Sequence, residues 1–199
     1  MLGVLTGFKR RAAMEEASYS LYRTAIEQAR LPLFYRAFAV EDSVDGRFDL
    51  LTLHVYLILR RLRQQDAVGQ DLGQRLFDLM FADMDQNLRV MGVSDMRVGK
   101  RVKAMAQAFY GRVAAYDAGL GLDGAPATGD LADAVRRNVY RGAEHAPAVA
   151  LAAYMRRCDA VLQGQDDAAL SAGTVVFPDP AEVLAATPAP SAAPAAQTD

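Results

Sequence analysis

The chain has 199 residues, 52% of them hydrophobic, which is enough apolar material for one domain with a buried core and tails. Its formal net charge of −2 excludes a strong overall attraction to nucleic acid, so no sequence-specific nucleic-acid partner is expected. The single cysteine, Cys158, excludes an internal disulfide framework and is typical of a reducing compartment.

Residues 1–13 are expected to form a flexible basic start to the chain. Apolar residues there precede the basic run Lys9–Arg11, which is the reverse of the order in a secretory signal, so export is not expected. Such a segment suits an anionic membrane surface, and an untethered chain end is the alternative. The most apolar internal run, Phe48–Leu59, contains Asp49 and His54 and is shorter than the about 20 residues that span a bilayer, so it indicates a buried helix.

Apolar residues at helical spacing predict the elements in chain order. Pro32 ends the first helix, and an acidic turn at Glu41–Gly46 precedes a second helix whose apolar residues face nearly every direction, as expected at the centre of a bundle. Gly92 suits a left-handed helix cap, and Asp130 suits an amino-terminal cap. The expected helices cover about Glu16–Arg30, Arg47–Leu59, Val68–Met91, Ser94–Tyr116, Asp130–Tyr140, Pro147–Leu162 and Asp166–Ser171.

After the last of these helices, Thr174–Phe177 is expected to be extended. Five of the chain's eight prolines occur from Pro178 onward among alanine, serine and threonine, so this segment has too few bulky apolar side chains to offset the entropy of ordering. The sequence therefore predicts an all-α fold. A single compact multi-helix bundle is expected over residues 14–177, and a disordered Pro/Ala-rich tail over residues 178–199.

Asp83 interrupts the apolar arc of the helix expected over Val68–Met91. A desolvated carboxylate is costly unless it is paired or protonated, so a polar group should meet it. Arg47 or Arg112 is the first candidate for this partner. Access of Asp83 to solvent at a gap between helices is the alternative.

Four cations crowd the first turns of the helix that begins near Ser94, where the helix dipole disfavours each of them by a few tenths to about 1 kcal/mol. An acidic partner, a phosphate-rich surface such as a ribosome, or anionic lipid would each supply a reason for this placement. A solvated basic face is the alternative. The four residues are Arg97, Lys100, Arg101 and Lys103.

Neither metal chemistry nor nucleophilic chemistry is indicated by the sequence. His54 and His145 share no Glu-x-x-His arrangement and Cys158 has no thiol partner, so no metal or other cofactor is expected. Cys158 is interpreted as a structural thiol, and His54 as a hydrogen-bonded core residue rather than a general base. The chain is therefore not expected to be an enzyme.

Five segments between about Leu21 and Leu120 together resemble the ubiquinol-cytochrome c chaperone family, although each of them alone is a weak signal. Val90 departs from the family pattern, which usually has an acidic residue there. The segments are QARLPLFY (28–35), VEDSVDGRFDLLTLH (40–54), FADMDQNLR (81–89), GVSDMRV (92–98) and KAMAQAFYGRVAAY (103–116).

This resemblance implies a chaperone in the biogenesis of the respiratory cytochrome bc complex. It implies that newly made cytochrome b, a very apolar multispanning subunit, is bound and held until haem insertion and subunit addition. A small partner protein and an association with the ribosomal exit region are also implied by mitochondrial members. The expected location is the cytoplasm, with peripheral contact at the cytoplasmic face of the inner membrane.

A chaperone of this kind needs an apolar or aromatic groove that masks its client, with polar rims for orientation and release. Core packing is the alternative for every aromatic residue considered. Candidate groove residues are Phe34, Tyr35, Phe38, Phe109, Tyr110 and Tyr116. Candidates for pairing with client loops are Arg30, Arg47 and Arg112, and candidates for an electrostatic docking patch are Lys100, Arg101 and Lys103.

Two other functions remain open at this point. One is a helical enzyme or carrier that acts on an apolar isoprenoid or lipid, for which Asp83, His54 and an arginine should converge in a deep cavity. The other is a general adaptor unrelated to respiration.

Overall fold

The computed structural model describes residues 2–122, 125–144 and 146–186, and every regular element in that part of the chain is an α-helix. The predicted all-α class is therefore confirmed. The helices are α1 (Leu2–Ala29), α2 (Pro32–Arg36), α3 (Val44–Arg63), α4 (Ala67–Val90), α5 (Asp95–Leu120), α6 (Leu131–Asn138), α7 (Ala148–Gln163), α8 (Asp167–Ser171) and α9 (Pro180–Ala186).

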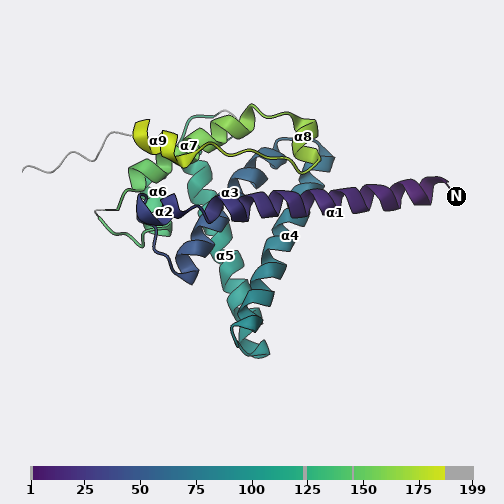
Figure 1. The fold of residues 1–199 in the computed structure, drawn as a ribbon, viewed down its shortest axis with the longest axis horizontal. Coiled ribbons are helices and arrows are strands. Elements are labelled where there is room, and N and C mark those ends of the chain that lie inside the picture. The colour runs from purple at the N-terminus through teal and green to yellow at the C-terminus, as the bar shows by residue number, and fades with distance from the viewer. Residues whose placement is uncertain (1, 123–124, 145, 187–199) are drawn as a thin grey trace, which may run out of the picture.

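Helix α3 lies at the centre of the bundle and packs against α1, α4 and α7, as its apolar sequence predicts. Leu50, Val55 and Tyr56 point in three different directions from α3 and are at most 1% exposed. Helices α4 and α5 form a long hairpin whose connecting turn lies far from the other helices (Figure 1). The bundle therefore has a packed base around α3 and a projecting hairpin.

The first helix begins much earlier than predicted. Helix α1 starts at Leu2 rather than near Glu16, so the expected flexible start of the chain is helical. Residues 9–16 contain no proline or glycine and are rich in lysine, arginine, alanine and glutamate, which have high helix propensity, so the helix continues past its packed portion. In Figure 1 this end of α1 extends beyond the other helices.

The beginning of the expected disordered tail also contains a helix, α9. Pro180 occupies its first turn, where a missing N–H is not needed, and Asp179 accepts a hydrogen bond from the backbone N–H of Ala181 at 2.8 Å. Val183 and Leu184 pack against the core, which supplies the stabilisation that composition alone did not indicate. The part of the predicted tail over residues 187–199 lies outside the described residues.

The caps expected from the sequence are largely present. Gly92 has a φ of +81°, the left-handed conformation that ends α4, and Asp130 accepts from the backbone N–H of Ala132 at 2.8 Å. Ser94 precedes α5 as predicted, but its side chain makes no capping hydrogen bond to that helix. Pro32 follows the first helix and itself begins the five-residue α2, which was not predicted as a separate element.

His54 is a buried, hydrogen-bonded core residue, as predicted. Its Nδ1 lies 2.8 Å from the Leu50 carbonyl oxygen and must donate there, so its Nε2 accepts from the Tyr154 hydroxyl at 2.9 Å. Gln28 donates to the same hydroxyl at 2.9 Å, which links α1, α3 and α7. Burial lowers the pKa of His54 to about 4, because the charged imidazolium has no counterion there.

A buried charge cluster joins the carboxyl-terminal end of α3 to α5 and α7. Arg60, 5% exposed, lies 3.0 Å from Asp117 and 2.9 Å from Asp159 through its guanidinium nitrogens. Asp117 also accepts from the Tyr56 hydroxyl at 2.8 Å and pairs with Arg63 at 3.1 Å. Every charge in this cluster has an opposite partner, which is the condition under which buried ions are tolerated.

Candidate functional site

An open groove of about 790 Å³ lies where α1, α3, α4, α5 and the end of α6 meet. Its floor is formed by apolar side chains that point from the four long helices into the space between them. Two methionines contribute to this floor, and the flexible thioether side chain adapts to ligands of different shape. The floor residues are Ile26, Phe48, Leu51, Met84, Leu88 and Met105.

Arginines dominate the polar lining of the groove. Six arginines stand against three aspartates, so the groove carries an excess of positive charge in a protein whose overall charge is negative. The arginines are Arg30, Arg47, Arg101, Arg112, Arg137 and Arg141, and the aspartates are Asp45, Asp49 and Asp83.

A buried ion cluster on Asp49 shapes one wall of the groove. Arg112 on α5 donates from Nη2 to Oδ1 of Asp49 at 2.6 Å. Arg141, in the turn after α6, brings its Nη1 within 2.7 Å of Oδ2 as an ion pair that lacks the alignment of a hydrogen bond. Asp49 is 1% exposed, and burial raises the pKa of its carboxyl against the opposing effect of the two arginines. The cluster holds two guanidinium groups along the wall.

The remaining arginines of the groove differ in whether they have a partner. Arg47 pairs with Asp42 at 2.7 Å at the exposed rim. The guanidinium groups of Arg30, Arg101 and Arg137 form neither a hydrogen bond nor an ion pair with any residue that the structure describes. Three cations are therefore available to negatively charged groups of a bound partner.

Asp83 has a different partner from the one predicted. Its Oδ2 accepts a hydrogen bond from the Tyr22 hydroxyl at 2.8 Å, whereas Arg47 and Arg112 pair with Asp42 and Asp49. The prediction of an arginine was wrong. Helix α1 packs along α4 and places Tyr22, rather than an arginine, within hydrogen-bond distance of this carboxylate.

The structure separates the predicted partner-binding residues into three groups. Tyr35 and the arginines Arg30, Arg47, Arg101 and Arg112 line the groove. The aromatic residues Phe34, Phe38, Phe109 and Tyr116 are in the core and present no surface to a partner, which is the alternative that the sequence left open. Tyr110, Lys100 and Lys103 are exposed outside the groove on α5.

Several groove residues were not singled out from the sequence. Met84 and Met105 have ordinary core spacing on their helices, and Arg137 and Arg141 lie beyond the segments that carry the resemblance. The expected convergence of Asp83, His54 and an arginine does not occur, because His54 is enclosed in the core away from the groove. The only feature of the sequence that points to Arg137 and Arg141 is the excess of arginine over residues 136–141.

A metal site and a membrane-spanning helix are both absent from the part of the chain that the structure describes. Among the described residues, no group of three or more histidine, cysteine, aspartate or glutamate side chains is arranged to hold a metal ion. None of the described helices is long and apolar enough to cross a bilayer.

Comparison with known proteins identifies the family. The model of the ubiquinol-cytochrome c chaperone family matches residues 36–177. The chain belongs to this family. The match includes α3 to α8 and most of the groove, and it extends beyond the segment that carried the resemblance in the sequence.

A crystal structure of a Cbp3 homologue from Brucella abortus is similar to the chain with a TM-score of 0.78 and 36% sequence identity, covering 90% of this chain and 98% of the other. Among relatives, ubiquinol-cytochrome c reductase complex assembly factor 1 of Xenopus laevis is 24% identical over 104 residues, 52% of this chain and 52% of that protein. The mouse (Mus musculus) protein of that name is 27% identical over 104 residues, 52% of this chain and 35% of its own length. The chain thus spans about half or less of these relatives.

Proposed function

We propose that the chain assists assembly of the ubiquinol-cytochrome c reductase complex by binding newly made cytochrome b in the groove. The observation that carries the proposal is an apolar, methionine-containing floor bordered by unpaired arginines in a member of this chaperone family. The names of the relatives describe assembly factors of that complex, which supports the same role.

Binding in this proposal is noncovalent and reversible. The floor masks apolar client side chains from water, and the gain is about 25 cal/mol for each Å² of apolar surface removed. The arginines orient the client through its carboxylates or backbone carbonyls, and these exposed interactions are weak enough to allow release. A small partner protein and the ribosomal exit region are further proposed associations, and the cytoplasmic face of the inner membrane is the proposed location.

The experiment is affinity capture of the tagged full-length chain from cells that assemble the complex, with cytochrome b identified and quantified among the bound subunits. Met105→Glu places a carboxylate on the groove floor and should strongly reduce captured cytochrome b. Gln107→Glu places the same charge on the exposed face of α5 and should leave capture unchanged. Circular dichroism of both variants checks that each is folded.

Equal capture of cytochrome b by both variants would remove the groove from the proposal. Deletion of the gene provides the broader test. If the reductase complex then accumulates normally and is fully loaded with haem, the assembly role itself is contradicted.

A further inference from the structure

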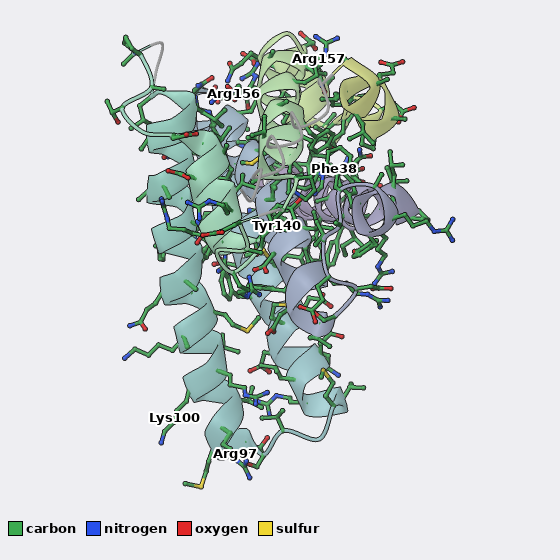
Figure 2. The ribbon with its side chains drawn as sticks, turned by 90° about the vertical axis from the view of Figure 1, so that its left-hand side faces the viewer. Phe38, Arg97, Lys100, Tyr140, Arg156 and Arg157 are labelled. Carbon is green, nitrogen blue, oxygen red and sulfur yellow. The ribbon has the colours of Figure 1, made fainter. Side chains whose placement is uncertain are left out.

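The end of the α4–α5 hairpin, residues 89–103, projects from the body of the protein. We call this segment the hairpin tip. Figure 1 shows the turn between α4 and α5 far from the other helices, and Figure 2 shows Arg97 and Lys100 near the end of the hairpin. No residue from 89 to 97 is buried, so this stretch adds nothing to the core.

Large apolar side chains are exposed at the hairpin tip. Val90, Met91 and Met96 are all exposed, and Met96 is the most exposed of them at 86%. These three residues lie within seven positions of one another, whereas the other exposed large hydrophobic residues are scattered along the described chain. Apolar side chains clustered at a projecting end indicate an interaction surface rather than packing.

Positive charge surrounds these apolar side chains. The hairpin tip contains five cations and one acid, Asp95, which is paired with Arg89. The other four cations are exposed and form no ion pair with a described residue, although the amino-terminal end of a helix disfavours cations. These four are Arg97, Lys100, Arg101 and Lys103.

We propose that the hairpin tip docks the protein on an anionic lipid bilayer. Val90, Met91 and Met96 enter the headgroup region, and the cations meet lipid phosphates around them. Stable attachment to a membrane surface takes two signals, and apolar insertion with a basic cluster supplies both. An RNA backbone would use the cations alone and would leave the three apolar side chains in water, so the combination favours a bilayer.

The docking geometry places the groove next to the membrane. Met91 and Arg101 belong both to the hairpin tip and to the groove lining, so the groove begins where the tip ends. A membrane-inserted partner would then meet the groove without crossing free solution. The docking proposal itself does not depend on what the groove binds.

The first test uses the absence of tryptophan from the chain. Met96→Trp introduces the chain's only tryptophan at the tip, where it can be excited selectively over the tyrosines, and Val149→Trp introduces one at an exposed apolar position on α7. With vesicles of phosphatidylcholine and phosphatidylglycerol, emission from the Met96→Trp protein should shift to the blue, and emission from the Val149→Trp protein should not. Vesicles of phosphatidylcholine alone should shift neither.

The second test measures cosedimentation of the full chain with the same anionic vesicles. Each cation near a bilayer surface contributes about fivefold to binding at 25 °C, so the variant Arg97→Gln, Lys100→Gln, Lys103→Gln should bind on the order of 100-fold more weakly. This triple variant keeps Arg101 and therefore the groove. Neutralising Lys9, Arg10 and Arg11 is the matched control and should have the smaller effect.

Three results would overturn the proposal. Tryptophan at position 96 remaining in water while the protein is bound to vesicles would exclude insertion of the tip. Loss of vesicle binding in the Lys9–Arg11 variant, with normal binding by the tip variant, would assign docking to the start of α1. Failure of the intact chain to bind anionic vesicles, together with salt-sensitive binding of ribosomes through the tip cations, would assign the tip to RNA.

Discussion

His54 should make the stability of this protein depend on pH in a way that can be calculated. Burial lowers its pKa to about 4 in the native state, whereas a histidine in the unfolded chain has a pKa of about 6.5. Between these two values the unfolded state binds a proton that the native state does not bind. Stability therefore falls as the pH falls through this range.

The size of the effect follows from the distance between the two pKa values. Each pH unit removes about 1.4 kcal/mol from the free energy of unfolding, so the whole interval of about two and a half units removes about 3 kcal/mol. This is a large share of the stability of an ordinary domain, which is about 5–15 kcal/mol. Acid sensitivity should therefore begin well above the pKa of the carboxylates.

Urea unfolding, followed by far-ultraviolet circular dichroism at a series of pH values, measures this directly when the intact chain is compared with His54→Gln. The glutamine amide retains polar groups near Tyr154 but does not titrate. Carboxylates whose pKa is lowered by arginine partners, such as Asp133 and Asp167, are common to both proteins and cancel in the difference. The difference in unfolding free energy should change by about 3 kcal/mol between about pH 6.5 and about pH 4.

The difference in unfolding free energy at any single pH reports only the cost of the substitution. Parallel pH dependence of the two proteins, by contrast, would contradict the reasoning, because it would mean that native His54 titrates like a solvated histidine. Its enclosure by Tyr154, Phe34 and Phe177 would then have to be open to water.

Other substitutions test the packing of the base. Asp117→Asn leaves Arg60 buried without its full counterion and should lower the free energy of unfolding by about 3–5 kcal/mol, measured by urea titration; a loss below about 1 kcal/mol would contradict this account. Gly119→Ala places a Cβ 2.7 Å from the Leu131 Cα and should cost about 1–3 kcal/mol by forcing α5 and α6 apart. Gly111→Ala, in the same helix with open space around the new methyl group, should raise stability by up to about 1 kcal/mol; equal effects of the two alanines would refute the steric explanation.

Much of the fold could be predicted because local patterns specify it. Apolar periodicity located α3 at the centre, and Gly92 and Asp130 marked helix ends through side-chain and backbone chemistry that acts within a few residues. The early start of α1 and the presence of α9 were not predicted. The start of α1 lies beyond the packed part of that helix and depends on the high helix propensity of its residues. Helix α9 also contains strong helix formers, but a helix of seven residues is marginal by itself and depends on packing against the core, which composition does not reveal.

The candidate site was less accessible to sequence reasoning. Arg30, Arg47 and Arg112 were predicted as candidates for pairing with client loops, and each lines the groove. Pattern alone did not distinguish a buried aromatic such as Phe34 from a half-exposed one such as Tyr35, although the two are adjacent, because their environment depends on which helices pack over them. The groove exists only through contacts between segments far apart in the chain.

The distribution of buried polar groups explains how this protein combines a packed base with an exposed groove and hairpin tip. Helix α3 carries Asp49 near one end, His54 in the middle and Arg60 near the other, and each is tied to a neighbouring helix or turn. Two of these contacts are ion pairs with α5, one from Asp49 to Arg112 and one from Arg60 to Asp117. They fix the position of α5 along its second half. Among the residues that the structure describes, no hydrogen bond or ion pair joins the first half of α5 to α3, so a contact made at the hairpin tip would not disturb the buried polar groups of the core.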